Sequence, residues 1–494
     1  MLITDLEPTY REIFLSALVL LWFATGMAQL PGLEDWINTI GLISLSLILG
    51  WAGYRQLKLD IASLWTPLLW YRVATLSYFG IGSLVPIWTN YETKALIKAF
   101  YDFYPLETVK LNLLITVFHV VFLLTVKGVF YVIRDWKISA ENSNPNALIH
   151  HSRLSMLVFG STCMIIGSIV NYFVVFPQIV GWIRLPFFST ISNFSALAWV
   201  GYFMVTLWAL RNGRRELVVL PIILAIGESA IGVFAMSKTA MLNPLIMLGI
   251  AFVYHRQSIS RILLFCGITL PLILFLAPII TYARETNNAL YSGSATVAEI
   301  PNIYASYFSN DRRQDQYSEV QLGWARLSYV NAGTFIISQY DHGLPGTSYR
   351  YWSIVWIPRV IYNNKPIITD VSRELSYAAS GNYDTSSSAG LAAEAYWNGG
   401  WIAVGGIAIF VGLLFTLCSI YSFVVIHRQA WHLFFIVLIG MRMALRVDGA
   451  FVADILGPIA LMVLAHVSLE LINRFLPQGM ARWGRPIQQN IGLH

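Results

Sequence analysis

The sequence predicts an all-α polytopic membrane protein with about twelve transmembrane helices and one large, partly helical extracytoplasmic loop. Hydrophobic residues make up 56% of the 494 residues, and charged residues only 12%, whereas soluble domains carry about 25% charged residues. Apolar runs of about 20 residues recur along the chain, and each is long enough to cross a bilayer as a helix. Between about Thr281 and Gly400 this apolar character is lost, and arginine, tyrosine and tryptophan become frequent.

The predicted spans follow these apolar runs, with boundaries that are defined to within a few residues. They lie near 12–31, 37–54, 64–87, 108–133, 154–178, 187–210, 217–236, 240–255, 261–281, 402–426, 431–447 and 451–473. The sequence is therefore divided into three parts. Residues 1–281 hold the first nine spans, residues 282–401 form the large loop, and residues 402–494 hold the last three spans and a tail.

The distribution of Lys and Arg predicts the orientation, because short cytoplasmic loops are enriched in these residues. One set of alternating connections is rich in them and includes the segments around Arg55, Arg134, Arg211 and Arg256, whereas the other set is poorer. With twelve spans, both termini then lie in the cytoplasm and the large loop lies outside. The enrichment of cytoplasmic loops in Lys and Arg also explains the net charge of +6. This charge therefore gives no reason to expect nucleic acid as a partner.

Several classes of site are disfavoured by missing motifs. The sequence has no glycine-rich nucleotide loop, no H-E-x-x-H motif and no D-x-D motif, so a nucleotide-sugar synthase and an enzyme with a metal held by acidic loop residues are disfavoured. We expect no cofactor and no metal.

The first stretch with candidate functional residues is Ser237-Lys238-Thr239, which precedes an apolar run. Lys238 in a tight outer turn at the start of a helix is suited to contact phosphate. The alternative is an interfacial lysine whose ammonium reaches the lipid headgroups.

The second stretch runs from Ile357 to Pro366 and places Arg359 and Lys365 between two prolines. A stiff segment loses less entropy when its cations clamp a phosphate. The alternative is a rigid turn with solvated charges.

The third stretch, 390–401, contains Glu394 among small and aromatic residues, directly before an apolar span. A carboxylate in such an apolar site can act as a general base, and the alternative is an acid at a helix start, favoured by the helix dipole. His342, in a polar part of the loop, is the second candidate base.

Charges inside the predicted spans form a separate group. Arg442 and Arg446 are four residues apart and so share a helix face. Charge within the bilayer is costly and usually faces a cavity or a partner. The two arginines are candidates either for contacting an anionic substrate or for pairing with Asp448 and Asp454. Two further charges, Arg72 and Glu228, also lie within predicted spans. We expect them to pair with each other or with these arginines.

In this order, the three stretches resemble the Wzy-type oligosaccharide repeat-unit polymerases, which make O-antigen and exopolysaccharide. These proteins tend to have a Ser-Arg/Lys turn before a mid-chain helix, a Pro-Arg…Lys-Pro segment in a large periplasmic loop, and a Glu-aromatic…Gly segment entering a late helix. The resemblance covers roughly residues 237–425. Lys238 stands where these proteins more often have arginine.

The resemblance implies a GT-C-like integral glycosyltransferase that joins two polyprenyl-diphosphate-linked oligosaccharides at the periplasmic face of a bacterial inner membrane. Its partners would be these lipid-linked substrates, the lipid bilayer and a chain-length regulator. Because the leaving group is a diphosphate, cations can stabilise its developing charge without a metal. The residues expected to do so are Arg284, Arg326, Arg359 and Lys365.

Two alternatives remain open. A ligase of the O-antigen type would use the same donor and a different acceptor. A transporter or flippase for a glycan or another anion would need a central polar path, which Arg72, Glu228 and Arg442 would fit. We find no inverted repeat of the kind many transporters show, and the outer loop is large for a transporter.

Overall fold

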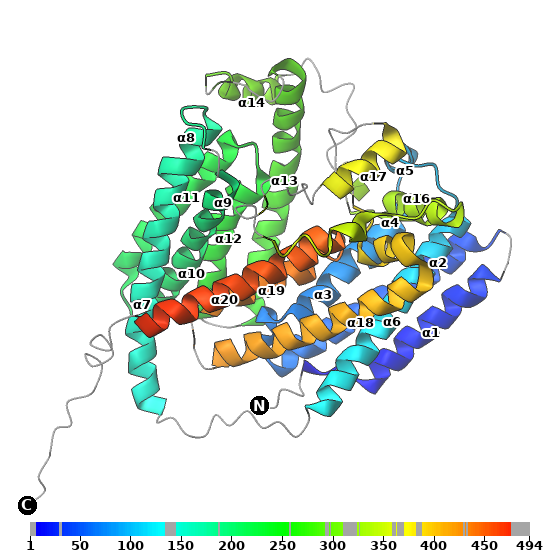
Figure 1. The fold of residues 1–494 in the computed structure, drawn as a ribbon, viewed down its shortest axis with the longest axis horizontal. Helices are drawn as coiled ribbons and strands as arrows, with labels where there is room; N and C mark the ends of the chain where they lie inside the picture. The colour runs from blue at the N-terminus through cyan, green and yellow to red at the C-terminus, as the bar shows by residue number, and fades with distance from the viewer. Residues whose placement is uncertain are drawn as a thin grey trace, which may run out of the picture. The chain divides into compact units, whose positions relative to one another are not determined.

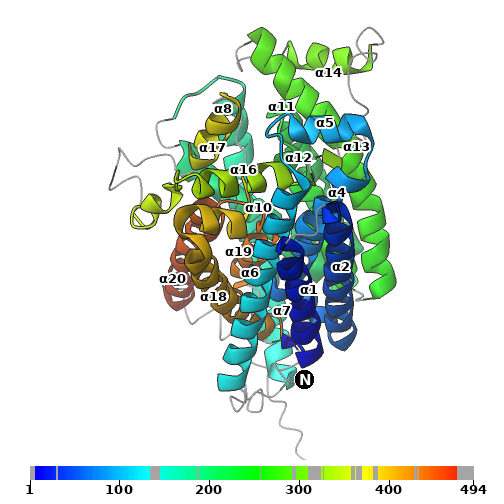
Figure 2. The same ribbon diagram turned by 90° about the vertical axis from the view of Figure 1, so that its right-hand side faces the viewer.

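The computed structural model describes residues 6–28, 32–133, 145–185, 188–255, 258–291, 296, 298–309, 324–325, 327–357, 362, 370–381, 388–427, 430 and 433–475. Every regular element within these ranges is a helix, which confirms the predicted all-α class. Figures 1 and 2 show these helices from two directions.

Seven of the described helices are long and apolar enough to cross a membrane, which confirms a helical, membrane-type architecture. They are Tyr10–Met27, Glu34–Leu59, Pro67–Trp88, Pro105–Val132, Met156–Ile179, Arg215–Phe234 and Leu391–His427. Shorter apolar helices coincide with the other predicted spans, namely Ala196–Arg211, Ala240–His255, Ser260–Thr269, Phe434–Leu445 and Phe451–Val467. A total of twelve spans therefore stays a prediction.

The chain forms two compact units that do not follow the order of the sequence. The first contains Met1–Ile138, Val320–Arg428 and Ile436–Leu471, and the second contains Ser139–Glu319, Gln429–Phe435 and Ile472–His494. The start of the chain thus folds together with the end of the large loop and the late helices. We describe each unit by itself.

The first unit is a bundle in which α6 lies beside α1 and α18 (Figures 1 and 2). Its elements are α1 (Tyr10–Met27), α2 (Glu34–Leu59), α3 (Pro67–Thr75), the π-helical turn η3 (Leu76–Ile81), α4 (Gly82–Trp88), α5 (Tyr91–Lys98), α6 (Pro105–Val132), α16 (Val330–Asp341), the 3₁₀ turn η8 (Ser348–Tyr351), α17 (Asp370–Ser380), α18 (Leu391–His427), α19 (Phe434–Leu445), the π-helical turn η10 (Phe451–Leu456) and α20 (Gly457–Phe475). Stacked aromatic rings fill its core, and the centroids of Tyr71 and Phe122 are 3.8 Å apart.

Helix α18 is broken near its start. Gly399 and Gly400 leave helical geometry, and Gly400 has φ 59° and ψ −154°, a conformation that only glycine adopts readily. A Cβ on Gly400 would also lie 2.7 Å from the hydroxyl oxygen of Tyr340. The break separates a short first part, which carries Glu394, from the long apolar part that follows.

A second break separates the last two helices of the first unit. Helix α19 ends at Leu445, and the backbone stays non-helical until η10 begins at Phe451. The start of α18 meets this second break, because the backbone nitrogen of Leu391 donates to the carbonyl of Val447 at 3.0 Å. Irregular backbone within a membrane bundle is tolerated where protein surrounds it, and Val447 is buried.

The second unit is built from helices that approach each other closely at small residues. Its elements are α7 (Pro145–Val170), the π-helical turn η4 (Asn171–Val175), α8 (Phe176–Ile179), α9 (Phe188–Ser192), α10 (Ala196–Arg211), the 3₁₀ turn η6 (Arg215–Val218), α11 (Val219–Phe234), α12 (Lys238–His255), α13 (Ile259–Tyr291) and α14 (Ile300–Phe308). A Cβ on Gly167 would lie 2.1 Å from the backbone nitrogen of Ala198, and one on Gly201 would lie 2.4 Å from that of Met164. Such contacts are typical of helices packed in lipid.

The partners expected for the intramembrane charges Arg72 and Glu228 were wrong. Arg72 instead makes a bidentate ion pair with Glu12, with Nε–Oε1 and Nη2–Oε2 distances of 2.9 and 3.1 Å, and donates to Gln56 at 2.6 Å. Glu228 accepts a hydrogen bond of 2.6 Å from the hydroxyl of Tyr202. Each charge therefore has a partner within its own unit, although Oε2 of Glu228 has none among the described residues. The partners lie on helices that sequence spacing does not bring together.

Candidate functional site

Several predicted cations fall on parts of the chain that the structure does not describe. Arg326, Arg359 and Lys365 lie outside the described residues, and Lys238 is described only by its backbone, as the first residue of α12. Their predicted role in binding a diphosphate therefore stays a prediction.

Arg284 lies in the second unit, on α13, next to one of these predicted positions. Its side chain is exposed, and Nη2 donates to the carbonyl of Met236 at 3.0 Å. Met236 has φ 48°, so the chain turns sharply just before α12. The structure thus brings Arg284 to the Ser237-Lys238 turn, and two predicted phosphate-binding residues come from neighbouring segments.

Glu394 is buried in the first unit, with 5% of its surface exposed. Its Oε2 accepts a hydrogen bond of 2.6 Å from the backbone nitrogen of Phe451, the first residue of η10. A carboxylate at this position is favoured because helix N-termini carry partial positive charge and unpaired N–H groups. Its other oxygen, Oε1, is buried and makes no hydrogen bond of normal geometry to a described residue, while the nearby Ser348 hydroxyl stabilises the ionised carboxylate.

The side chain of Asn398 ties the segment after α16 to the turn that carries Glu394. Its Nδ2 donates to the carbonyl of Glu394 at 2.9 Å and to Oγ of Ser348 at 2.8 Å. Its Oδ1 accepts from the backbone nitrogen of Tyr349 at 3.3 Å. A residue one helical turn from Glu394 therefore fixes η8 in place beside it.

Arg446 pairs with both of the acids that were predicted as its partners. Its Nε donates to Asp454 at 3.1 Å, and its Nη1 lies 3.6 Å from Oδ2 of Asp448. Asp448 is buried and also accepts a hydrogen bond of 2.5 Å from the hydroxyl of Tyr329. Because two carboxylates already compensate its charge, Arg446 is less available to a diphosphate than a free cation would be.

Arg442 differs from Arg446, although both were predicted to share a helix face. It lies within α19, which ends at Leu445, whereas Arg446 lies in the break that follows. Its side chain is exposed, and no hydrogen bond or ion pair links it to another residue that the structure describes. Of the two, Arg442 is the one that remains able to bind an anion.

The other candidate base, His342, lies at the C-terminal end of α16 and is exposed. Its Nδ1 is 2.7 Å from the carbonyl oxygen of Ser338 and therefore donates to it, which leaves Nε2 as the acceptor of a neutral ring. The preceding Asp341 pairs with Lys110 and accepts a hydrogen bond of 2.8 Å from Tyr396. Asp341 thus holds α16 on the bundle and is not hydrogen-bonded to the imidazole.

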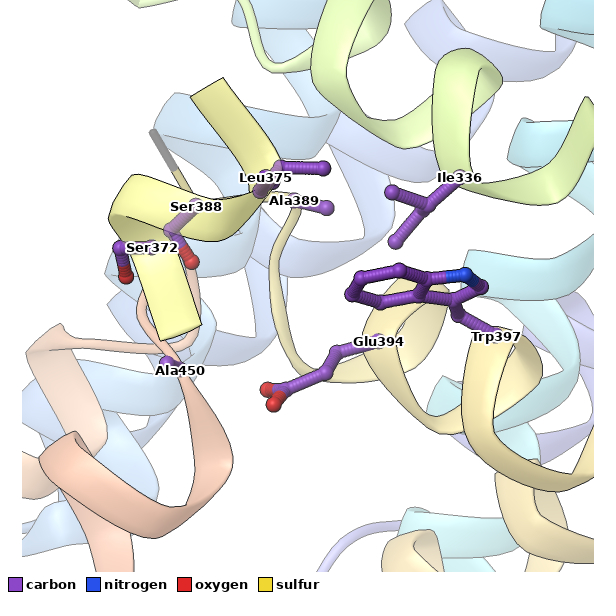
Figure 3. A pocket seen from close by; sticks show the side chains of 8 residues that line it. All are labelled: Ile336, Ser372, Leu375, Ser388, Ala389, Glu394, Trp397 and Ala450. Carbon is purple, nitrogen blue, oxygen red and sulfur yellow. The ribbon is translucent and has the colours of Figure 1, made fainter. Parts of the chain in front are cut away.

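A small pocket opens at Glu394, with a cavity volume of about 10 Å³, which is room for about one water-sized group. It is lined by Ile336, Ser372, Leu375, Ser388, Ala389, Glu394, Trp397 and Ala450. Figure 3 shows the Glu394 carboxylate directed toward Ala450, with the flat Trp397 indole nearby. The indole is held by a hydrogen bond of 3.1 Å from Nε1 to the carbonyl of Leu344. Among the described residues that line the pocket, Glu394 is the only ionisable one.

Sequence reasoning missed Tyr329, Ser348, Tyr349 and Asn398. Asn398 carried a usable signal, because it lies four residues after Glu394 and so shares a helix face with it. The other three lie far from Glu394 in sequence, in a loop with many tyrosines and serines, and nothing local distinguishes them.

Comparisons with protein-family models, with curated proteins and with solved structures give no match for this chain. The resemblance to repeat-unit polymerases therefore remains a basis for a proposal, together with the geometry at Glu394.

Proposed function

We propose that this protein polymerises polyprenyl-diphosphate-linked oligosaccharide repeat units at the periplasmic face of a bacterial inner membrane, in O-antigen or exopolysaccharide synthesis. The observation that carries the proposal is the buried carboxylate of Glu394, which lines a pocket and keeps one oxygen without a partner among the described residues. The pocket lies where α17 and the end of the large loop meet the first part of α18. The proposed orientation places both termini in the cytoplasm.

The reaction needs a base and a way to stabilise a leaving diphosphate. A hydroxyl oxygen of one glycan attacks the anomeric carbon of the other, and Oε1 of Glu394 accepts the hydroxyl proton. The bond between the anomeric carbon and the diphosphate breaks, and its electron pair leaves with the lipid diphosphate. The donor is already activated, so no nucleotide is required. Cations are proposed to stabilise the departing charge, namely Arg326, Arg359, Lys365 and Arg442.

The test is an assay of the purified protein in detergent with a polyprenyl-diphosphate-linked oligosaccharide, followed on a gel. We expect a ladder at repeat-unit spacing without nucleotide sugar. Glu394→Gln keeps the shape of the side chain but removes the base. We expect the rate of ladder formation to fall by about 10²–10⁴-fold, the usual contribution of a general base. Glu374→Gln is the matched control, because Glu374 pairs at 3.1 Å with Arg350, which is 54% exposed. A full-length ladder from Glu394→Gln at the wild-type rate would remove Glu394 from the mechanism.

A transporter is the second candidate, because two broken helices meet in the first unit. The start of α18 and the segment between α19 and η10 are joined through Leu391 and Val447, and membrane transporters build binding sites from discontinuous helices of this kind. Movement of lipid-linked single units across proteoliposomes, without polymer, would favour the transporter. Polymer formation without such movement would favour the polymerase.

A further inference from the structure

Tyr349 in η8 is an additional polar residue beside Glu394. Its hydroxyl is buried and has no hydrogen-bond partner among the described residues. Its ring lies 5.4 Å from that of Phe451, whose backbone nitrogen binds Glu394. Burial, followed by the charge of Glu394, raises the pKa of Tyr349 well above its usual range. The hydroxyl therefore stays protonated and remains a donor at neutral pH.

Two polar atoms thus belong to side chains that contact Phe451, because Glu394 binds its backbone nitrogen and the ring of Tyr349 lies beside its ring. Oε1 of Glu394 is an acceptor and the hydroxyl of Tyr349 is a donor, and within the described part of the chain neither has a partner. Leaving a buried polar group of this kind unpaired costs about 1–3 kcal/mol. One unpaired acceptor together with one unpaired donor indicates a ligand that donates a hydrogen bond to Glu394 and accepts one from Tyr349.

The chemistry of the two atoms selects the class of ligand. A phosphate or carboxylate would be repelled by Glu394, and an ammonium group would have no lone pair for Tyr349. An alcohol hydroxyl satisfies both, since its proton points to Glu394 while one lone pair accepts from Tyr349. Its second lone pair stays free, which is what a nucleophile requires.

We propose that Tyr349 and Glu394 form a hydroxyl-binding subsite that holds the attacking hydroxyl of the acceptor glycan, an inference that rests on the proposed polymerase function. Asn398 positions both halves, because it bonds the backbone nitrogen of Tyr349 and the carbonyl of Glu394. The backbone nitrogen of Gly346 also donates to the carbonyl of Trp397 at 2.9 Å. These contacts join η8 to the first part of α18, so the two groups are held in place before the ligand binds.

The decisive variant is Tyr349→Phe, which removes only the hydroxyl. We expect about a tenfold rise in the KM for the acceptor oligosaccharide, the usual effect of losing one hydrogen bond, with an unchanged or higher melting temperature. Tyr351→Phe is the matched control from the same turn, because the hydroxyl of Tyr351 accepts a hydrogen bond of 2.6 Å from Arg350. The control should keep the acceptor KM of the wild type.

Two results would overturn the subsite. An unchanged acceptor KM in Tyr349→Phe would show that the hydroxyl does not hold the acceptor. A fall in melting temperature of about 2 °C or more in this variant would show that the hydroxyl already has a partner in the free protein.

A third measurement separates the subsite from the proposed function, because it needs no turnover. Methyl glucoside and glycerol serve as hydroxyl probes, and the rise in melting temperature that they cause is compared between the wild type and Tyr349→Phe. We expect a larger rise in the wild type, whereas equal rises would refute the subsite. If the wild type forms no ladder but shows the larger rise, the polymerase proposal fails and the hydroxyl subsite stands.

Discussion

Oε2 of Glu394 accepts a hydrogen bond of 2.6 Å from the backbone nitrogen of Phe451, 57 residues further along the chain. A carboxylate on the first part of one broken helix thus caps the start of another. Its acceptor role is filled at Oε2, while Oε1 remains unpartnered among the described residues. One side chain can therefore support the fold with one oxygen and act on a substrate with the other.

This relationship predicts that Glu394 variants separate stability from activity. Glu394→Gln retains a side-chain oxygen that can accept from Phe451, so we expect its free energy of unfolding to stay within about 1 kcal/mol of the wild type. Glu394→Ala leaves a buried N–H unpaired and should lose about 1–3 kcal/mol. Denaturant unfolding in detergent measures both. Equal stability of Glu394→Ala and the wild type would show that the cap contributes nothing.

The buried ion pair of Arg72 and Glu12 predicts a strong dependence on both partners. Arg72→Ala leaves Glu12 charged and buried, and should lower the free energy of unfolding by about 3–5 kcal/mol. The double variant Arg72→Met/Glu12→Leu removes both charges and should recover most of that loss. Lys98→Ala is the control, because its pair with Asp102 is 42% and 72% exposed, and such pairs contribute about 0–1 kcal/mol. A double variant with no higher free energy of unfolding than Arg72→Ala would contradict this account.

The break in α18 predicts that only one of two nearby glycines is replaceable. Gly400→Ala should destabilise the protein, because φ is 59° and the new Cβ would lie 2.7 Å from the Tyr340 hydroxyl oxygen. It should also impair polymer formation, because the break positions Glu394. Gly405→Ala is the control, since no atom lies within 4 Å of its Cβ, and alanine favours a helix interior by about 1 kcal/mol. Thermal unfolding and the ladder assay together distinguish these outcomes, and similar melting temperatures for the two variants would argue against a required break.

The buried carboxylate of Glu228 predicts a role for Tyr202 in holding the second unit together. Tyr202→Phe removes the hydroxyl that donates to Glu228 at 2.6 Å, and should cost about 1–3 kcal/mol because a buried carboxyl group loses one of its donors. In Glu228→Leu the same tyrosine substitution should cost clearly less. Unfolding measurements on the two single variants and the double variant give this coupling, and purely additive losses would show that the two side chains do not depend on each other.

Part of the candidate site could be predicted because its residues are unusual for their surroundings. Glu394 is a lone acid among small residues, and Arg446 lies in an apolar run with two acids close by in sequence. Arg446 is at most eight residues from its partners Asp448 and Asp454. Residues this close in sequence are also close in space, so the pairing could be predicted. Tyr349 could not be found in this way, since its significance depends on its hydroxyl lacking a hydrogen-bond partner among the residues that the structure describes.

The sequence by itself determined that this chain forms apolar helices suited to a membrane, because the composition and length of each run are local properties. The tertiary structure alone decided which charges distant in sequence meet. Glu12 and Arg72 are 60 residues apart, and Glu394 pairs with a backbone group that carries no sequence signal. Hydrophobic periodicity predicts only that a side chain is buried. Which residue it contacts depends on how the helices pack and on where the two helices are broken. The oxygens of Tyr349 and Glu394 that lack a partner among the described residues are likewise a consequence of packing.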